Sequence, residues 1–388
     1  MNSAITASTG ACGRVFRLAA LLAAAGLLFS AVPARAGGPG SAGVQILKSD
    51  ISPRAAGMAG SFAAVADDVY AMNYNPAGLG QLYLPQASAM YYSGFDDSRL
   101  NYFAFAMPLP VQGVAGYDKP GVGISALFTN SGDFVYRPIQ PDGTVPAISM
   151  NAETTKVLTL SYAEKVYAGE TDLEGYKANI EQYLGFSAKY VNSKLLDTYS
   201  ASALAMDAGW LVRDLNSGVS FGVSAANLGS GLKYYQQSTP LPSILRVGAA
   251  FQPPTVMSQS LLFTVDGDLY LQEKLKSLRA GIEYRFQDIF ALRLGYKGLD
   301  DNKGMAFGMG INYQNFSLDF GMLVSGQVFN TSQMAFSYQF AGWHTAEVKK
   351  KKERVWLAPE PKARQGGTSS GSAPKQAPKK DSDFFWIY

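Results

Sequence analysis

The chain has 388 residues, of which 16% are charged and 12% are aromatic, and its formal net charge is +3. Basic residues cluster only in a C-terminal tail, which argues against a nucleic-acid partner. The single cysteine, Cys12, excludes a disulfide framework. Few charges, many aromatic residues and 40 glycines are instead typical of a membrane-spanning β-sheet.

Residues 1–36 have the pattern of an export signal. Arg14 and Arg17 precede an apolar run of about 13 residues, and Ala34-Arg35-Ala36 has the small-x-small form that signal peptidases cut. The apolar run is shorter than the roughly 18 to 20 residues that a membrane-spanning helix needs. We therefore predict a cleaved signal peptide and an exported mature chain.

Residues 37–80 lack strand-like alternation and are predicted to form a plug, or hatch, in the lumen of a barrel. Ser52 followed by Pro53 predicts the start of a helix. The stretch RAAGMAGSFAAVA, which comes next, consists mostly of small residues. Small side chains would let its backbone pack closely against the inside of a narrow barrel.

The predicted plug ends in a turn motif. Asp67 or Asp68 is expected to cap a second short helix, and Asn75 and Pro76 are expected to end it. Gly78 is expected to adopt a positive φ, because glycine tolerates that conformation in turns.

Residues 81–340 are predicted to form an antiparallel transmembrane β-barrel. The clearest signal is a period of two, in which Met305, Phe307 and Met309 alternate with Ala306 and Gly308. A secreted β-sandwich also alternates, but its water-facing strands usually carry Lys, Glu and Thr. A sheet in lipid must close on itself, since an unpaired edge finds no hydrogen bonds there.

The same alternation, followed back along the chain, predicts fourteen strands, an even number as in bacterial barrels. Short links at 214–216, 287–288 and 314–315 predict the periplasmic end. The link AGETDLEGYKAN is too long for a periplasmic turn, and we expect a small helix or a misplaced strand there. The predicted strands are 86–93, 99–109, 121–130, 155–166, 183–193, 199–213, 217–227, 243–252, 259–271, 276–286, 289–298, 304–314, 315–325 and 331–340.

Residues 341–388 form a basic tail with ten Lys or Arg and five Asp or Glu. Its mixture of Pro, Gly, Ser and Lys cannot bury a core, so we predict a disordered periplasmic tail. The last residues, DSDFFWIY, form an aromatic cluster. This cluster is either a docking segment for a periplasmic or secretion-system protein or a plain chain end.

Two separated blocks resemble a known family. The segment RAAGMAGSFAAVADDVYAMNYNPAGLG resembles the signature of the PorV/PorQ family, within the group similar to FadL, the long-chain fatty acid transporter. The stretches KYVNSKLLDTYSASALAMDAGWLVR and GVSAANLGSGLKYYQQSTPLPSILRVGAAF resemble that family's middle strands. The resemblance covers residues 43–340 and implies a fourteen-strand barrel with an N-terminal hatch.

The resemblance implies two different functions. In the FadL group the hatch and a kinked strand admit a hydrophobic ligand and release it sideways into the membrane. In PorV proteins the barrel serves type IX secretion and receives exported proteins. The basic tail departs from both patterns, which weakens any transfer of partners to this chain.

Catalytic chemistry finds little support. The only histidine, His344, follows the last predicted strand, so a Ser-His or Cys-His device is not indicated. No zinc spacing, phosphate loop or cofactor fingerprint is present, and we expect no enzyme, cofactor or metal site. Asp266 and Asp268 share one face of a strand. We interpret them as lumen groups paired with basic residues rather than as catalytic carboxylates.

Lumen arginines are the other candidate site. The expected role is a charge network that braces the plug, since buried charges need partners. The alternative is that two arginines clamp the carboxylate of a fatty-acid-like ligand. The candidate ligand-binding residues are Met58, Phe62 and Tyr74 in the plug, and Arg246, Arg279 and Arg293 in the strands.

The sequence therefore predicts an outer-membrane β-barrel of a Gram-negative bacterium, surrounded by outer-membrane lipid. Its leading predicted function is passage of hydrophobic or amphipathic, fatty-acid-like molecules. One alternative is a PorV-like component of type IX secretion that binds exported proteins. The other is a structural barrel that anchors an envelope assembly through its tail.

Overall fold

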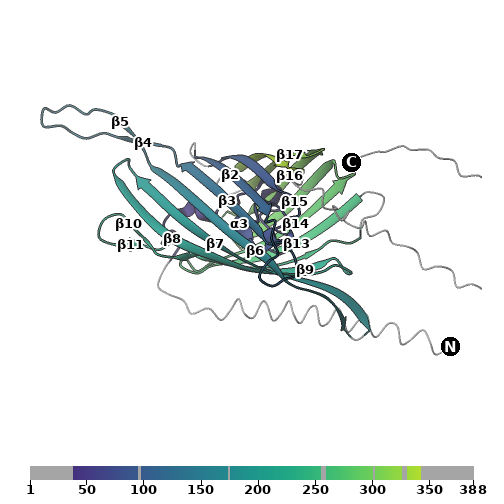
Figure 1. Cartoon of the computed structure of the whole chain (residues 1–388). Coiled ribbons are helices and arrows are strands. Elements are labelled where there is room, and N and C mark those ends of the chain that lie inside the picture. The colour runs from purple at the N-terminus through teal and green to yellow at the C-terminus, as the bar shows by residue number, and fades with distance from the viewer. Residues whose placement is uncertain are drawn as a thin grey trace, which may run out of the picture.

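The alternating segments form β-strands that close into a barrel (Figure 1). The structure is a computed structural model, and the predicted signal peptide and all of the predicted tail after Ala341 lie outside the residues that it describes. The described residues are 38–94, 98–173, 175–254, 259–299, 302–325 and 330–341.

All fourteen predicted strands are present, and each pairs antiparallel with its two neighbours. β1 and β18 close the ring, with Met90 opposite Ala335. The barrel strands are β1 (Gln86–Ser93), β2 (Arg99–Pro108), β3 (Gly121–Asn130), β6 (Glu153–Leu173), β7 (Tyr176–Leu195), β8 (Tyr199–Asp214), β9 (Val219–Gly229), β12 (Ile244–Phe251), β13 (Gln259–Tyr270), β14 (Leu275–Phe286), β15 (Phe290–Gly298), β16 (Gly304–Tyr313), β17 (Phe316–Ser325) and β18 (Thr331–Gln339).

Two strands are much longer than predicted. β6 has 21 residues and β7 has 20, and they remain paired as far as Leu173 and Tyr176. The link expected to hold a helix or a misplaced strand is therefore the far part of a β-hairpin. β3 pairs with β6 only as far as Ala163, so the hairpin continues beyond this neighbour. The alternation of apolar and polar residues fades in this part because a strand outside the lipid needs no row of apolar side chains on its outer face.

Two small hairpins lie at the other end of the barrel, which we call the outer end (Figure 1). β4 (Asp133–Tyr136) pairs with β5 (Ile148–Asn151), and β10 (Leu232–Lys233) pairs with β11 (Ser238–Thr239). Both hairpins belong to long links. Long links at one end and short turns at the other are the pattern of outer-membrane barrels.

Large apolar side chains cover the outside of the strands. On β16, Met305, Phe307, Met309 and Ile311 are between 41% and 56% exposed, whereas Ala306 is fully buried. A closed barrel with this surface is an outer-membrane barrel of the Gram-negative type. Among the described residues, no helix combines the length and the hydropathy needed to cross a membrane.

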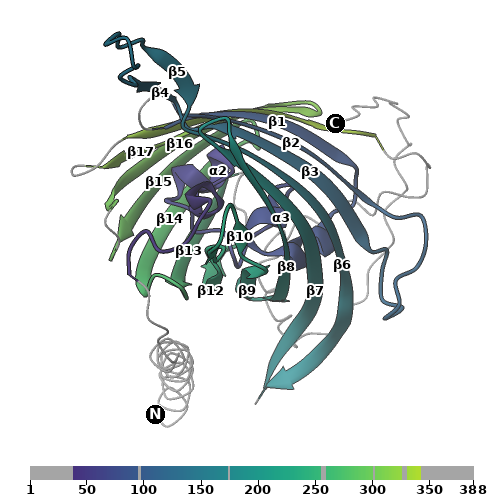
Figure 2. The same cartoon turned by 90° about the vertical axis from the view of Figure 1, so that its left-hand side faces the viewer.

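The N-terminal segment lies inside the ring of strands (Figure 2). It contains four short helices, which are η1 (Gln45–Lys48), α2 (Pro53–Gly57), α3 (Ala71–Tyr74) and η2 (Pro76–Gln81). Ser52 caps α2 as expected, since its Oγ accepts a hydrogen bond from the Ala55 N–H at 3.2 Å. We call residues 52–82 the wedge and residues 40–49, which precede it on the outer side, the strap.

Glycines on the inner face of the barrel make room for the wedge. A Cβ atom on any of them would come within 3 Å of a wedge atom, so the wedge backbone lies directly against the wall. Such contact requires the small side chains that the sequence places on both sides. The wall glycines in contact with the wedge are Gly121, Gly123, Gly185, Gly209, Gly222, Gly281, Gly295, Gly308 and Gly321.

The expectation of a positive φ at Gly78 is wrong. Gly78 is absent from the positive-φ glycines of the described chain. A Cβ atom there would instead collide with the Ala66 carbonyl oxygen. Close approach between two parts of the wedge, and not turn conformation, is the reason that position 78 requires glycine.

Adding one methyl group to the wall beneath the wedge should destabilise the barrel. In Gly222→Ala the new Cβ would meet the Ala63 carbonyl oxygen, and overpacking of this kind costs about 1–3 kcal/mol. We expect a lower unfolding temperature, measured by the loss of the folded band on heating in SDS. Gly298→Ala is the control, because its nearest neighbour is the movable Tyr296 ring at 3.2 Å. Equal unfolding temperatures for both variants would contradict the close contact.

Candidate functional site

A cavity of about 370 Å³ lies at the outer end of the barrel, and we call it the vestibule. Its walls are the outer ends of strands, with Thr129 on β3, Tyr270 on β13 and Thr331 on β18 among them. Its floor is the N-terminal segment, from Gln45 to Asp50. The volume lies in the range of about 300–1,000 Å³ that is typical of small-molecule sites.

A second cavity lies deeper in the lumen and holds only about 20 Å³, room for about one water molecule. The strap and the residues after it separate the two cavities. Ile46, Lys48 and Asp50 line the vestibule, whereas Leu47 and Ile51 line the inner cavity. Ser49 lines both cavities, so in places a single layer of chain stands between them.

Glu273, in the link between β13 and β14, holds the strap. Its carboxylate accepts hydrogen bonds from Gly40 N at 3.2 Å, Gln45 Nε2 at 2.8 Å and Lys48 Nζ at 2.6 Å. Burial alone would raise the pKa of Glu273, yet the bonds from Lys48 and Gln45 hold it below its ordinary value. One ionised group therefore accepts three of the hydrogen bonds that tie the strap to the outer end.

The backbone within the strap is strained at Val44, which has a φ of 50°. The left-handed region is disfavoured for a β-branched residue. Gly43 beside it donates its N–H to the Pro240 carbonyl at 2.9 Å. Strain of this kind persists only where surrounding contacts impose it.

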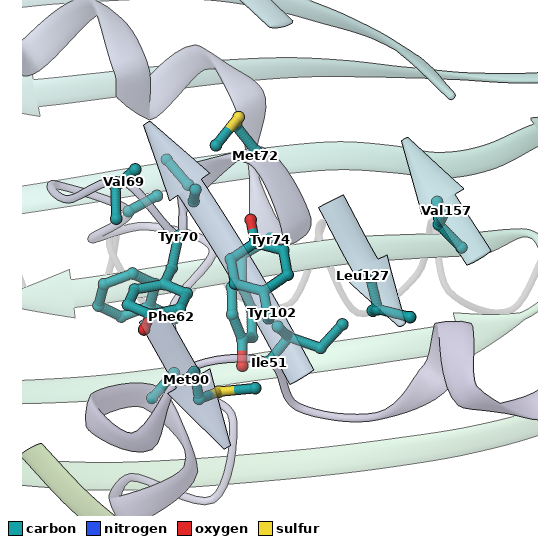
Figure 3. Packing of buried hydrophobic residues seen from close by; sticks show 14 of the residues in the cluster. Ile51, Phe62, Val69, Tyr70, Met72, Tyr74, Met90, Tyr102, Leu127 and Val157 are labelled. Atoms are coloured by element: carbon teal, nitrogen blue, oxygen red, sulfur yellow. The ribbon is translucent and has the colours of Figure 1, made fainter. Parts of the chain in front are cut away.

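The three predicted apolar ligand residues belong to one buried hydrophobic cluster, in which Figure 3 labels Phe62 and Tyr74. Met58 and Phe62 are fully buried and Tyr74 is 2% exposed. The Phe62 and Tyr74 rings meet edge to face at a centroid distance of 5.4 Å. None of the three lines either cavity of the described chain, and their assignment to a ligand stays a prediction.

Two of the predicted arginines share one carboxylate. Arg279 Nη2 lies 3.0 Å from Asp268 Oδ2, and Arg246 Nε lies 3.4 Å from the same oxygen. Arg279 Nη1 also binds Asp50 at 2.6 Å, and Arg246 Nη1 donates to the Asn73 carbonyl at 2.9 Å. Both arginines therefore connect the barrel wall to the N-terminal segment, and Arg246 also lines the inner cavity.

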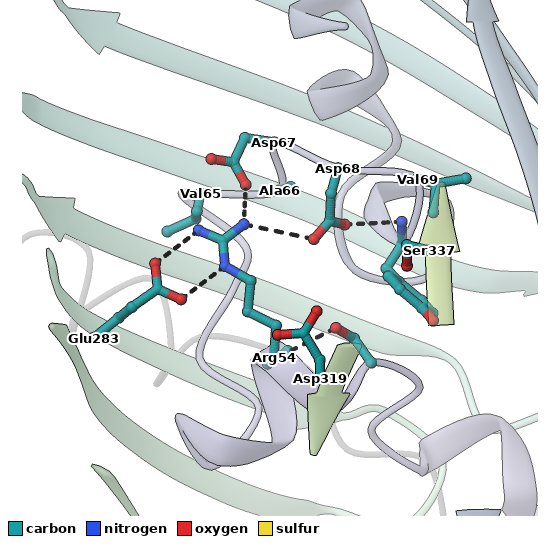
Figure 4. A network of polar contacts seen from close by, with 12 residues as sticks. Arg54, Val65, Ala66, Asp67, Asp68, Val69, Glu283, Asp319 and Ser337 are labelled. Carbon is teal, nitrogen blue, oxygen red and sulfur yellow. Dashed lines mark hydrogen bonds and ion pairs between the residues drawn. The ribbon is translucent and has the colours of Figure 1, made fainter. Parts of the chain in front are cut away.

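The third arginine, Arg293, belongs to a lumen charge network of the kind expected to brace the plug. Figure 4 shows its Arg54, Glu283 and Asp319 side chains, of which Arg54 was not among the predicted residues. Arg293 Nε binds Glu283 at 2.7 Å and its Nη1 binds Asp319 at 2.7 Å. Arg54 of α2 binds the same Glu283 at 2.9 Å. Arg54 is the single charged residue in the small-residue stretch of the wedge, and that isolation is the signal that could have identified it.

Asp67 and Asp68 do not cap a helix in the predicted way. Both pair with Arg54, and α3 begins after Tyr70 without a side-chain cap. Asp68 Oδ1 does accept a hydrogen bond from the Tyr70 N–H at 2.9 Å. Asp67 therefore has its partner in Arg54, and Asp68 binds both Arg54 and the N–H of the residue that precedes α3.

Asn75 and Asp266 hold the wedge through its backbone. Asn75 Oδ1 accepts from the Ala77 N–H at 3.2 Å, while its Nδ2 donates to the Ala63 carbonyl at 2.8 Å. Pro76 follows as the first residue of η2. Asp266 Oδ2 accepts from the N–H groups of Phe62 and Ala63, both at 2.7 Å. Asp268 thus pairs with basic residues as expected, whereas Asp266 binds the wedge backbone instead of a basic side chain.

Other chemistry has no visible site in the described ranges. No group of three or more metal-ligating side chains gathers among these residues. His344 lies outside them. The expectation that the chain is not an enzyme stays a prediction.

Comparisons with known proteins give structural likenesses only. No protein-family model matches the chain, and no curated protein matches it. The PorV/PorQ resemblance therefore stays a prediction. The toluene transporter TbuX of Ralstonia pickettii aligns with a TM-score of 0.48 and 15% identity, over 75% of this chain and 98% of that one.

Two further structures are similar to the same extent. The toluene transporter TodX of Pseudomonas putida has a TM-score of 0.47 and 11% identity, over 79% of this chain and 98% of its own. A FadL homologue of Pseudomonas aeruginosa has a TM-score of 0.44 and 10% identity, over 74% and 98%. A likeness of this size does not extend to the substrate.

Neutralising Asp68 should stabilise the protein at alkaline pH. Burial raises the pKa of Asp68 from 3.8 to about 6, and Arg54 offsets this only in part. Between about pH 4 and pH 6, Asp68 therefore keeps its proton in the folded state but has lost it in the unfolded chain. Stability from this group is present below that window and is lost as the pH rises through it.

In Asp68→Asn we expect a higher unfolding temperature than in the wild type at pH 8, and a difference that shrinks toward pH 4. Thermal unfolding followed by circular dichroism at both pH values measures it. Asp319→Asn is the comparison, since it removes a carboxylate bound to Arg293 and should lower the unfolding temperature at pH 8. A pH-independent difference for Asp68→Asn would refute the raised pKa.

Proposed function

We propose that this barrel passes hydrophobic or amphipathic small molecules across the outer membrane. The observation that carries the proposal is the pair of cavities in one lumen, separated by the strap. For a ligand in the vestibule to continue inward, the strap must move and the inner cavity must widen. The closed wall of fourteen strands supplies the fixed frame.

The strap is better suited to move than the wedge. The wedge is mostly buried, and wall glycines contact its backbone within residues 53–64 and 75–79. The strap is half-buried, carries the strained Val44 and depends on Glu273 for three hydrogen bonds. Elements that move in proteins are those with few buried apolar contacts.

The sequence also left two other functions open, and no contact among the described residues favours either. The tail proposed for partner binding lies outside the described residues. Secretion and anchoring therefore stay alternatives from the sequence alone.

Weakening the hold on the strap should speed passage. Glu273→Gln removes the charge that binds Lys48, and a charge-assisted hydrogen bond contributes about 1.5–3 kcal/mol. We expect cells that express the wild type to take up radiolabelled toluene faster than cells of the empty host. Cells that express Glu273→Gln should have an initial uptake rate several-fold higher than the wild type. The assay uses bacterial cells with an intact lipopolysaccharide leaflet that express each variant.

Glu153→Gln is the matched control for that assay. It removes the same charge from the vestibule wall, but its carboxylate binds Thr155 and Ser193 rather than the strap. Uptake no faster in wild type than in the empty host would refute the proposed function. Equal uptake by Glu273→Gln and Glu153→Gln would refute the role of the strap.

A disulfide across the strap should block passage reversibly. A Cβ atom on Gly43 would lie 3.7 Å from Thr239 Cβ, close to the mean of about 3.8 Å in disulfides. Gly43→Cys with Thr239→Cys should lose uptake when oxidised and regain it with dithiothreitol. The single variants are the controls, and no cysteine follows Cys12 in the native sequence. Undiminished uptake by the oxidised double variant would show that the strap is not the gate.

A further inference from the structure

The vestibule is more polar than a site for a plain hydrocarbon needs to be. Small-molecule sites are lined mainly by apolar side chains, with a few polar groups that fix orientation. Here residues with polar groups are more numerous than that. Only five of the nineteen lining residues have purely apolar side chains, namely Ile46, Ala56, Ala59, Leu275 and Leu323.

Two of the four charged residues that line the vestibule have partners of opposite charge. Lys48 binds Glu273 at 2.6 Å, and Asp50 binds Arg279 at 2.6 Å. These ion pairs neutralise charges that would otherwise attract an ionic ligand. Beside the Glu153 carboxylate, which accepts hydrogen bonds from the Thr155 and Ser193 hydroxyls, neutral hydrogen-bonding groups make up much of the remaining polar lining.

Gln333 on β18 has one such group. Its side chain is 3% exposed and lines the vestibule. Its Nε2 donates to the Asp50 carbonyl at 2.6 Å, which fixes the amide orientation. Its Oε1 has no hydrogen-bond partner among the described residues. Buried polar atoms are nearly always paired in native proteins, so this acceptor requires an explanation.

Apolar surface lies beside this acceptor. Leu323 on β17 pairs in register with Thr331, two residues before Gln333 on the same face of β18. Leu323 also packs with Ala59 of the wedge. A ligand with its apolar part on Leu323 and Ala59 would place a donor group near Gln333 after a small shift of the amide.

We propose that the vestibule binds small amphipathic molecules that carry a hydroxyl donor on an apolar ring or chain, and that Gln333 Oε1 accepts that hydroxyl. This rests on the proposed function and names its ligand class. A hydrocarbon leaves the acceptor unpaired. A carboxylate anion has no donor to offer it, so a fatty-acid anion suits this position less well than an alcohol or a phenol.

Phenol and toluene are the matched probes, because they have nearly the same shape and only phenol has a donor. Equilibrium dialysis of the barrel in lipid nanodiscs, with empty nanodiscs as the blank, gives a Kd for each. The readout is the ratio of the toluene Kd to the phenol Kd. We expect this ratio to be at least about fivefold smaller in Gln333→Leu than in the wild type, since one hydrogen-bond acceptor is lost.

The ratio protects the test from a folding defect, since general damage weakens both ligands alike. Gln339→Leu is the matched control, because it makes the same change at the other end of β18, outside the vestibule lining, and should leave the ratio unchanged. An unchanged ratio in Gln333→Leu, or no phenol binding by the wild type, would overturn the inference. A fall in the ratio without cellular uptake would support the binding site and refute the proposed passage.

Discussion

Backbone hydrogen bonding is the constraint on which the rest of this structure depends. Acyl chains offer no hydrogen bonds, so every strand must be paired on both sides and the sheet must close. β1 and β18 complete that closure. A ring of fourteen strands is wider than the roughly eight whose own side chains fill the interior. The wedge fills this space, and it fits because glycines line the wall opposite its backbone.

The filled lumen divides into a rigid part and a looser part for physical reasons. In the wedge, the buried ion pairs of Arg54 and Arg293 with Glu283 are expensive to break, because separation would leave charges buried without partners. The strap has fewer apolar contacts, and its main tie is to the single carboxylate of Glu273. A route through the barrel that opens the strap alone leaves the costly buried pairs intact.

The period-two pattern in the sequence was sufficient to predict the strands of the barrel wall but not the residues of the candidate site. Side chains that face lipid must alternate with those that face the lumen, and this made all fourteen strands visible. The hairpin beyond Ala163 escaped prediction because it leaves that environment. The role of Arg54 and the requirement for glycine at position 78 depend on tertiary contacts, with Glu283 and with Ala66 respectively, that no local pattern shows. The vestibule is likewise assembled from the ends of many strands, which no local pattern records.

The polar lining of the vestibule and the packing of the wedge together limit what this barrel can pass. A vestibule of about 370 Å³ admits a small molecule, and the inner cavity of about 20 Å³ must widen before anything larger than water continues. If the inner cavity widens by moving the wedge, the wedge backbone must separate from the wall glycines. If it widens by moving the strap, the hydrogen bonds between the strap and Glu273 must break. The second change is the smaller one, so ligand size should be set by how far the strap can move, and ligand chemistry by the neutral acceptor above it.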